Sequence, residues 1–232
     1  MRSAALDGRL LSVAKFVRQG AVFADVGTDH GYLPLFLLSE GRIERAICSD
    51  INEGPLESAR ANAVADGLEG RVKFYLTDGA AALSGEDIDD LAICGMGGEL
   101  IADIIDRAPF LRNGNIRLIL QPMSRQGQLR EYLFTHGYKI EEEVYSHSQG
   151  RYYLTVCASF KGEMTEPEPL LCELGEEKFL LRGGKDAYGY LLAKRKAYQK
   201  IANGKIKGGE SAERERAIIE RIDGICKGIK LG

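Results

Sequence analysis

The sequence predicts an α/β fold in which a mostly parallel sheet ends in an antiparallel hairpin and is followed by a C-terminal helical hairpin. Three observations lead to this fold class. Short apolar segments alternate with helical segments through residues 1–160, a pattern typical of strand–helix–strand crossover units. Two strand-like segments then follow one another around residues 148–150 with no helix between them. Finally, apolar residues recur at helical spacing in two stretches near the C-terminus.

The elements of the first 160 residues can be assigned in order. Apolar residues at helical spacing predict a leading helix from about Ser3 to Arg18. The expected strands are residues 21–26, 45–50, 72–77, 91–96 and 116–123. The expected helices between them are residues 32–40, 53–66, 97–107 and 124–136. Strands covered by helices on both faces read as nearly continuous apolar runs, as these do.

The remaining chain changes character twice. Residues 138–160 predict an antiparallel hairpin at the edge of the sheet. Residues 161–169 are polar and contain two prolines, which indicates a linker. Two amphipathic segments separated by the glycine-rich residues 203–209 predict helices that fold back on each other as a coiled coil. We therefore expect two domains, residues 1–160 and residues 161–232.

Composition and charge limit the class of protein. The five cysteines are scattered and never in CxxC spacing, which argues against a disulfide framework and a zinc site. No signal peptide or membrane span is recognisable, so we expect a cytoplasmic protein with no membrane partner and no metal. Residues 185–232 hold 12 Lys and Arg against 6 Asp and Glu. This basic excess suits a polyanionic partner, although a solvated lysine-rich helix face explains it equally well.

The turn after the first strand, "ADVGTDHGYLP" at residues 24–34, carries unusual chemistry. Ligands of open α/β sheets bind beyond the carboxyl ends of the strands, where this turn lies. Its glycines, Gly27 and Gly31, allow a ligand to approach the backbone closely. The spacing differs from the GxGxxG of dinucleotide-binding proteins, and Asp29 would repel a pyrophosphate. A carboxylate here favours a cationic ligand group such as an ammonium or sulfonium, and therefore S-adenosylmethionine over NAD.

The other strand ends add to this prediction. Asp50 follows the second strand, where a carboxylate can accept hydrogen bonds from ribose hydroxyls. Asp78 follows the third, where it can accept from an adenine amino group. Each aspartate could instead cap the next helix. The predicted cofactor-binding residues are Asp25, Gly27, Asp29, His30, Gly31, Asp50, Ile51, Asn52, Asp78, Gly79, Cys94, Gly95 and Met96.

The run "ADVGTDHGYLP…SDIN.GPL.SA…DG…ICGMGG…QPM" resembles the bacterial tRNA (adenine-N1)-methyltransferase family that modifies position 22. These are class I enzymes with a Rossmann-like fold, and the basic segment at 185–232 is similar to the family's C-terminal coiled coil. The resemblance covers nearly the whole chain. It implies S-adenosylmethionine as cofactor, tRNA as partner and methyl transfer to adenine N1.

Three residues are candidates for catalysis within this resemblance. Asp29 would either stabilise the cation that forms on the base or hold the ammonium of the cofactor. Gln121 could contact the adenine edge through its amide, or instead hold strand or loop amides. Tyr32 could stack on the target base or pack against the sheet. Arg9, on the leading helix, could cover the site.

Phosphate contacts are expected from the basic segment, through Lys194, Arg195, Lys196 and Lys200. Two alternatives remain open. The enzyme could methylate a small molecule, a protein or another RNA. The chain could also be a non-enzymatic RNA-binding module with a vestigial nucleotide fold. The sequence leaves the oligomeric state open, and a monomer is compatible with it.

Overall fold

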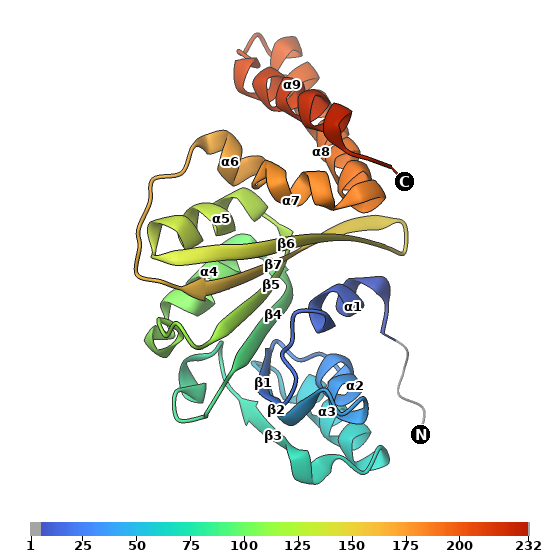
Figure 1. Cartoon of the computed structure of the whole chain (residues 1–232), viewed down its shortest axis with the longest axis vertical. Coiled ribbons are helices and arrows are strands. Elements are labelled where there is room, and N and C mark those ends of the chain that lie inside the picture. The colour runs from blue at the N-terminus through green and yellow to red at the C-terminus, as the bar shows by residue number, and fades with distance from the viewer. Residues whose placement is uncertain (1–5, 232) are drawn as a thin grey trace.

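The computed structural model describes residues 6–231 and has the predicted α/β architecture (Figure 1). In these residues one seven-stranded sheet has the order β3-β2-β1-β4-β5-β7-β6. Its strands are β1 (Ala21–Val26), β2 (Ile43–Asp50), β3 (Val72–Leu76), β4 (Asp90–Gly97), β5 (Arg117–Ser124), β6 (Tyr138–Ser148) and β7 (Arg151–Phe160). The first five are parallel, and β7 is antiparallel to both β5 and β6. Strand order reverses at β1, so a ligand is expected beyond the carboxyl ends of β1 and β4.

Crossover helices cover both faces of the sheet and bury two separate apolar cores. The helices are α1 (Gly8–Ala14), α2 (Tyr32–Ser39), α3 (Glu53–Ala65), α4 (Gly98–Asp106) and α5 (Gln126–Thr135). Alternate residues of β1 point to opposite faces, because the side-chain period of a strand is two. Phe23 packs with α1, α2 and α3, whereas Val22 and Ala24 pack with α4 and α5. Each face of the sheet therefore has its own apolar core.

The leading helix is shorter than the sequence predicts. Helix α1 begins after Asp7, whose carboxylate accepts a hydrogen bond from the Leu10 amide at 2.9 Å, and it ends at Ala14. The predicted start at Ser3 lies outside the described residues. Beyond Ala14 the chain makes tight turns, with the Phe16 amide bonded to the Val13 carbonyl. The apolar periodicity continues through these turns because Val17 is buried, and this misplaced the predicted end.

Within residues 161–231 four helices follow the sheet, and two of them were not predicted. After residues 161–168 come α6 (Pro169–Leu174) and α7 (Glu177–Arg182), which are each only six residues long. The predicted helical hairpin is formed by α8 (Gly184–Lys207) and α9 (Glu213–Gly228) (Figure 1). The predicted joint at 203–209 is wrong in its start, since α8 continues through Gly204 to Lys207. The chain leaves the helix at Gly209, whose φ of +78° suits glycine.

The C-terminal helices share a core with the sheet. Figure 1 shows α6 and α7 lying across the β6–β7 end of the sheet, and both α7 and α8 contact β6. Phe179 and Leu191 belong to the same buried cluster as Tyr145 and Leu154. The sequence boundary at residue 160 is therefore crossed by continuous packing. Within residues 6–231, the helices lack the length and apolar character needed to cross a bilayer.

Candidate active site

The glycine turn after β1 is anchored to the neighbouring strand. The amides of Gly27 and Thr28 both donate to the Ser49 carbonyl of β2, at 2.8 and 2.9 Å. Gly27 has φ +79°, and a Cβ on it would collide with the Met96 side chain. Gly31 has φ +72°, and a Cβ there would approach Ala59 to 3.0 Å. Only glycine suits both positions, because the backbone is left-handed and the surroundings are full.

Asp25 is a buried carboxyl at the end of β1. It accepts a hydrogen bond from the Thr28 hydroxyl, within the same turn. Burial raises the pKa of the Asp25 carboxyl to about 6, and the positive charge of Arg9 partly opposes this rise. Asp25 therefore lies in a weakly solvated environment directly beneath the turn.

Asp29, His30 and Tyr32 form an exposed group above that turn. The Asp29 side chain is 80% exposed, and its Oδ1 lies 3.4 Å from His30 Nε2. The rings of His30 and Tyr32 lie with centroids 5.3 Å apart. The structure thus brings three predicted site residues together beside the glycine turn, and Tyr32 is 45% exposed there.

The end of β2 presents a carboxylate beside exposed apolar side chains. Asp50 Oδ1 accepts from the Asn52 amide at 2.8 Å, which leaves its other oxygen for a ligand. Ile51 is 63% exposed and Leu76, at the end of β3, is 60% exposed. Because Leu76 pairs with Asp50 in the sheet register, these side chains gather at one edge. The sequence analysis missed Leu76; an apolar residue ending a strand beside polar turns was its only signal.

Asp78 has a partner that the sequence analysis did not foresee. Arg107 Nη1 lies 2.8 Å from Asp78 Oδ2, and the same guanidinium contacts Asp103 at 2.9 Å. Arg107 lowers the pKa of the Asp78 carboxyl and keeps it ionised. Gly79, with φ +76°, packs on Ile104. One side of Asp78 is therefore occupied by α4, and its other lone pairs remain for a ligand.

The end of β4 is irregular where it meets the turn. The register of β4 against β5 shifts between Cys94 and Met96, and Gly95 has φ +79°. Met96 extends over Gly27, so this segment and the glycine turn touch. Burial raises the pKa of the Cys94 thiol above its usual value, which keeps the sulfur protonated at neutral pH. A protonated thiol is a poor nucleophile, so Cys94 suits lining the site and does not suit attacking a substrate.

Gln121 is engaged within the protein, so its predicted contact with an adenine edge is unsupported in this arrangement. The residue is fully buried. Its Oε1 accepts from Arg9 Nη1 at 2.9 Å, and its Nε2 donates to the Arg9 carbonyl at 3.1 Å and to Thr155 Oγ1 at 3.3 Å. Both ends of the amide are thus occupied, and the residue holds α1 against the sheet.

Two of the four predicted phosphate-binding residues are engaged within the protein. Lys194 Nζ lies 2.7 Å from Glu173 Oε1, and its side chain is only 11% exposed. Arg195 donates to both carboxylate oxygens of Asp223, at 2.6 and 3.0 Å, and so joins α8 to α9. The predicted phosphate contacts of these two residues are therefore unsupported. The exposed Lys196 and Lys200 make no ion pair within residues 6–231.

Comparisons with known proteins agree with this fold. Residues 6–156 match the family described as "Methyltransferase domain". The tRNA (adenine(22)-N(1))-methyltransferase of Bacillus subtilis is 34% identical over 158 residues, which are 68% of this chain and 66%, just under two thirds, of that relative.

Two solved structures are similar over nearly the whole chain. A putative tRNA (m1A22) methyltransferase of Streptococcus pneumoniae superposes with a TM-score of 0.84 at 31% identity, covering 95% of this chain and 99% of that one. The structure of that S. pneumoniae protein in complex with S-adenosyl-L-methionine gives 0.80 at 31% identity, covering 94% and 98%. The chain therefore belongs to the methyltransferase domain family, and within it to the bacterial tRNA (adenine(22)-N(1))-methyltransferases.

Proposed function

We propose that the protein transfers a methyl group from S-adenosylmethionine to N1 of adenine 22 in tRNA. The observation that carries the proposal is the extent of the likeness to a relative in complex with that cofactor. It covers 94% of this chain and therefore includes the C-terminal helices as well as the sheet. A likeness of the sheet alone would support methyl transfer without indicating a substrate.

The residues at the strand ends fit this cofactor, which supplies a methyl group bonded to an electrophilic sulfonium. In this proposal the left-handed turn at Gly27 and Gly31 lets the amino-acid part of the cofactor approach the backbone closely. The free oxygen of Asp50 suits ribose hydroxyls, and the exposed Ile51 and Leu76 suit the faces of an adenine ring. The predicted contacts of the other strand-end residues remain part of this proposal.

Positioning supplies most of the catalysis in this proposal. An unpaired adenine N1 already carries a free lone pair, so no strong base is needed for attack on the methyl group. The base becomes cationic as the bond forms, and a nearby carboxylate stabilises that charge. Asp29 is exposed on the ligand side and suits this role or, alternatively, contact with the cofactor ammonium. Tyr32, also exposed, suits stacking on the flipped base.

The two parts of the chain have different tasks in this proposal. Residues 1–160 bind the cofactor and perform methyl transfer, and residues 161–232 hold tRNA through phosphate contacts of Lys196 and Lys200. A tRNA-modifying enzyme acts in the cytoplasm, where its substrate is. One chain supplies every residue of the proposed site, so a monomer suffices.

Mass spectrometry of nucleosides tests the proposal directly. Purified protein incubated with S-adenosylmethionine and tRNA should produce 1-methyladenosine, and tRNA with guanine at position 22 should yield none. Methylation of both RNAs, or of a small molecule or protein only, would point to another substrate. Binding of tRNA without any cofactor binding in calorimetry would indicate the RNA-binding module instead.

Replacing Asp50 with alanine should weaken S-adenosylmethionine binding while the fold persists. A hydrogen bond to a charged group contributes about 1.5–3 kcal/mol, so the dissociation constant should rise roughly 10- to 150-fold. Titration calorimetry measures this change, with circular dichroism as the check on folding. Asp66→Ala, at the end of α3 and away from the strand ends, is the matched control. An unchanged affinity in folded Asp50→Ala would remove Asp50 from the site.

Lys196→Gln together with Lys200→Gln should weaken tRNA binding and flatten its salt dependence. Each lost phosphate contact should reduce the slope of log affinity against log salt by roughly 0.7–0.9. Cofactor affinity should not change, because the cofactor site lies at the strand ends. Lys139→Gln with Lys161→Gln removes the same charge from the β6–β7 hairpin and serves as control. Equal slopes for wild type and the Lys196/Lys200 variant would exclude these two lysines as the phosphate-binding surface.

A further inference from the structure

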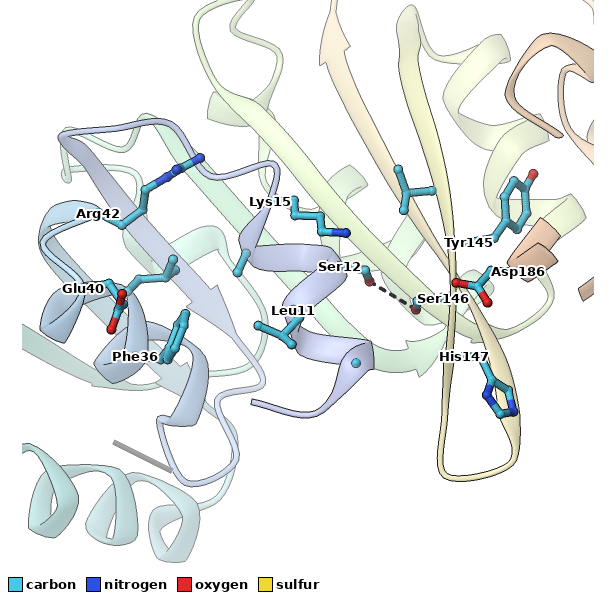
Figure 2. A pocket seen from close by; sticks show the side chains of 14 residues that line it. Leu11, Ser12, Lys15, Phe36, Glu40, Arg42, Tyr145, Ser146, His147 and Asp186 are labelled. Atoms are coloured by element: carbon cyan, nitrogen blue, oxygen red, sulfur yellow. Dashed lines mark hydrogen bonds between the residues drawn. The ribbon is translucent and has the colours of Figure 1, made fainter. Parts of the chain in front are cut away.

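Helix α1 is fastened to the sheet by a buried polar network in addition to its apolar contacts. Ser12, Gln121 and Thr155 are buried. Ser12 Oγ lies 2.7 Å from both the Arg9 carbonyl and Thr155 Oγ1, and Ser146 on β6 bonds to Ser12 at 3.4 Å (Figure 2). Buried polar side chains of this kind fix one orientation of a helix, because any other arrangement leaves them unsatisfied.

This network is joined to Arg9 through both Ser12 and Gln121. The Arg9 carbonyl accepts from both Ser12 and Gln121, and Arg9 Nη1 donates to Gln121 Oε1 at 2.9 Å. The remaining guanidinium donors make no hydrogen bond within residues 6–231; the Asp7 carboxylate lies 3.8 Å from Nε. The guanidinium is therefore held in place by one nitrogen while its other donors stay available.

Arg9 points to the predicted ligand edge of the sheet. A Cβ on Gly95 would lie 3.9 Å from Arg9 Nη1, and the Arg9 charge acts on both Asp25 and Cys94. The pocket of about 490 Å³ between α1, α2 and β6 in Figure 2 is lined by Leu11 and Lys15 and does not include Arg9. Arg9 therefore lies near the carboxyl ends of β1 and β4 and does not line that pocket.

We propose that Arg9 is an anion-binding residue of the active site and that Gln121 positions it. A guanidinium with free donors in a fixed plane matches a carboxylate or a phosphate. Two anions can reach the strand ends: the carboxylate of the cofactor's amino-acid part and a phosphate next to the target adenine. The identity of these anions rests on the proposed function. The buried amide of Gln121 holds both the backbone and the side chain of Arg9, so it acts through Arg9 without touching the ligand.

Calorimetry with two cofactors distinguishes the anions. If the carboxylate is bound, Arg9→Met should weaken S-adenosylmethionine at least tenfold and leave decarboxylated S-adenosylmethionine unchanged. If a phosphate is bound, both cofactor affinities should stay constant, while tRNA affinity falls at least tenfold. Lys15→Met removes a charge from the same end of the chain, on the pocket side of α1 (Figure 2), and should change none of these values.

Gln121 is tested through its coupling to Arg9. Gln121→Met should reproduce at least a threefold part of the Arg9→Met loss for the same ligand, and it should add nothing when Arg9 is already methionine. A merely structural role would lower affinity equally in both backgrounds. Gln121→Leu, which also removes both hydrogen bonds to Arg9, replaces Gln121→Met should the methionine variant fail to fold.

The failure of this inference differs from a failure of the proposed function. If wild-type protein binds S-adenosylmethionine and methylates tRNA, and Arg9→Met matches its affinities for S-adenosylmethionine and tRNA, the inference is wrong and the proposed function stands. If wild-type protein binds neither S-adenosylmethionine nor tRNA, both are wrong.

Discussion

Replacing Arg130 with methionine is expected to lower the free energy of unfolding by about 3–5 kcal/mol, the cost of leaving a buried charge without its partner. Arg130 on α5 and Glu143 on β6 are each 1% exposed and bonded at 2.6 and 3.1 Å. Arg130 also donates to the Cys172 carbonyl at the end of α6. The variant would leave Glu143 as a buried carboxylate whose remaining hydrogen bond, among residues 6–231, comes from the Tyr145 hydroxyl. Urea denaturation at pH 7 measures the loss.

Two further variants separate the buried pair from ordinary charge loss. Arg221→Met breaks an exposed ion pair with Glu177 at 2.7 Å, and exposed pairs contribute only about 0–1 kcal/mol. Arg130→Met combined with Glu143→Leu should recover part of the loss, because no unpaired charge remains buried. If Arg130→Met lowers the free energy of unfolding no more than Arg221→Met does, the buried Arg130–Glu143 pair does not stabilise the fold in this way.

Asp25→Asn is expected to stabilise the cofactor-free protein by about 3 kcal/mol above pH 6, since one pKa unit corresponds to about 1.4 kcal/mol. Burial raises the Asp25 pKa from 3.8 to about 6, so the folded state holds its proton more tightly than the unfolded state. Below pH 3.8 both states are protonated and the carboxyl costs nothing. Between pH 3.8 and 6 wild-type stability falls as pH rises, and above 6 the cost is constant.

Urea denaturation across this pH range tests the sign as well as the size. The difference in the free energy of unfolding between Asp25→Asn and wild type should be near zero at pH 3.5. It should increase toward pH 6 and stay constant to pH 8. Asp29→Asn removes a carboxylate from an 80% exposed side chain of the same turn and serves as the control in the absence of cofactor. A variant that is less stable than wild type throughout would show that Asp25 supports the fold. Stabilisation would instead mark Asp25 as a residue kept for its ligand, at a cost to stability.

The sheet and its ligand edge were predictable because parallel strands place their carboxyl ends together. Asp25, Asp50 and Asp78 each follow an apolar run of the sequence, and the structure puts all three at that edge. The parallel direction of the first five strands and the hairpin at residues 148–150 were likewise implied by the presence or absence of a helix between neighbouring strands. These inferences depend only on local periodicity and on rules of chain connection.

Side-chain partners across the fold were not predictable in the same way. Gln121 is bonded to a residue 112 positions away, and its amide gave no sign of whether it faced a ligand or a helix. Lys194 and Arg195 contributed to a basic stretch, but charge counts do not reveal that Glu173 and Asp223 neutralise them. Helices of six residues, such as α6, are too short to display a helical period.

The shared core between β6 and the C-terminal helices restricts where the chain could be recombined with a relative. A graft at residue 160, where the sequence changes character, would replace Phe179 and Leu191 and so expose the β6 side chains that they cover. Leu192 and Ala193 of α8 are already exposed. A transplant that begins there would keep Phe179 and Leu191 with their native sheet, although it would still replace Ile218 and Ile222 of α9, which belong to the same buried cluster. The segment suited to exchange between relatives is thus shorter than residues 161–232, which the composition delimits.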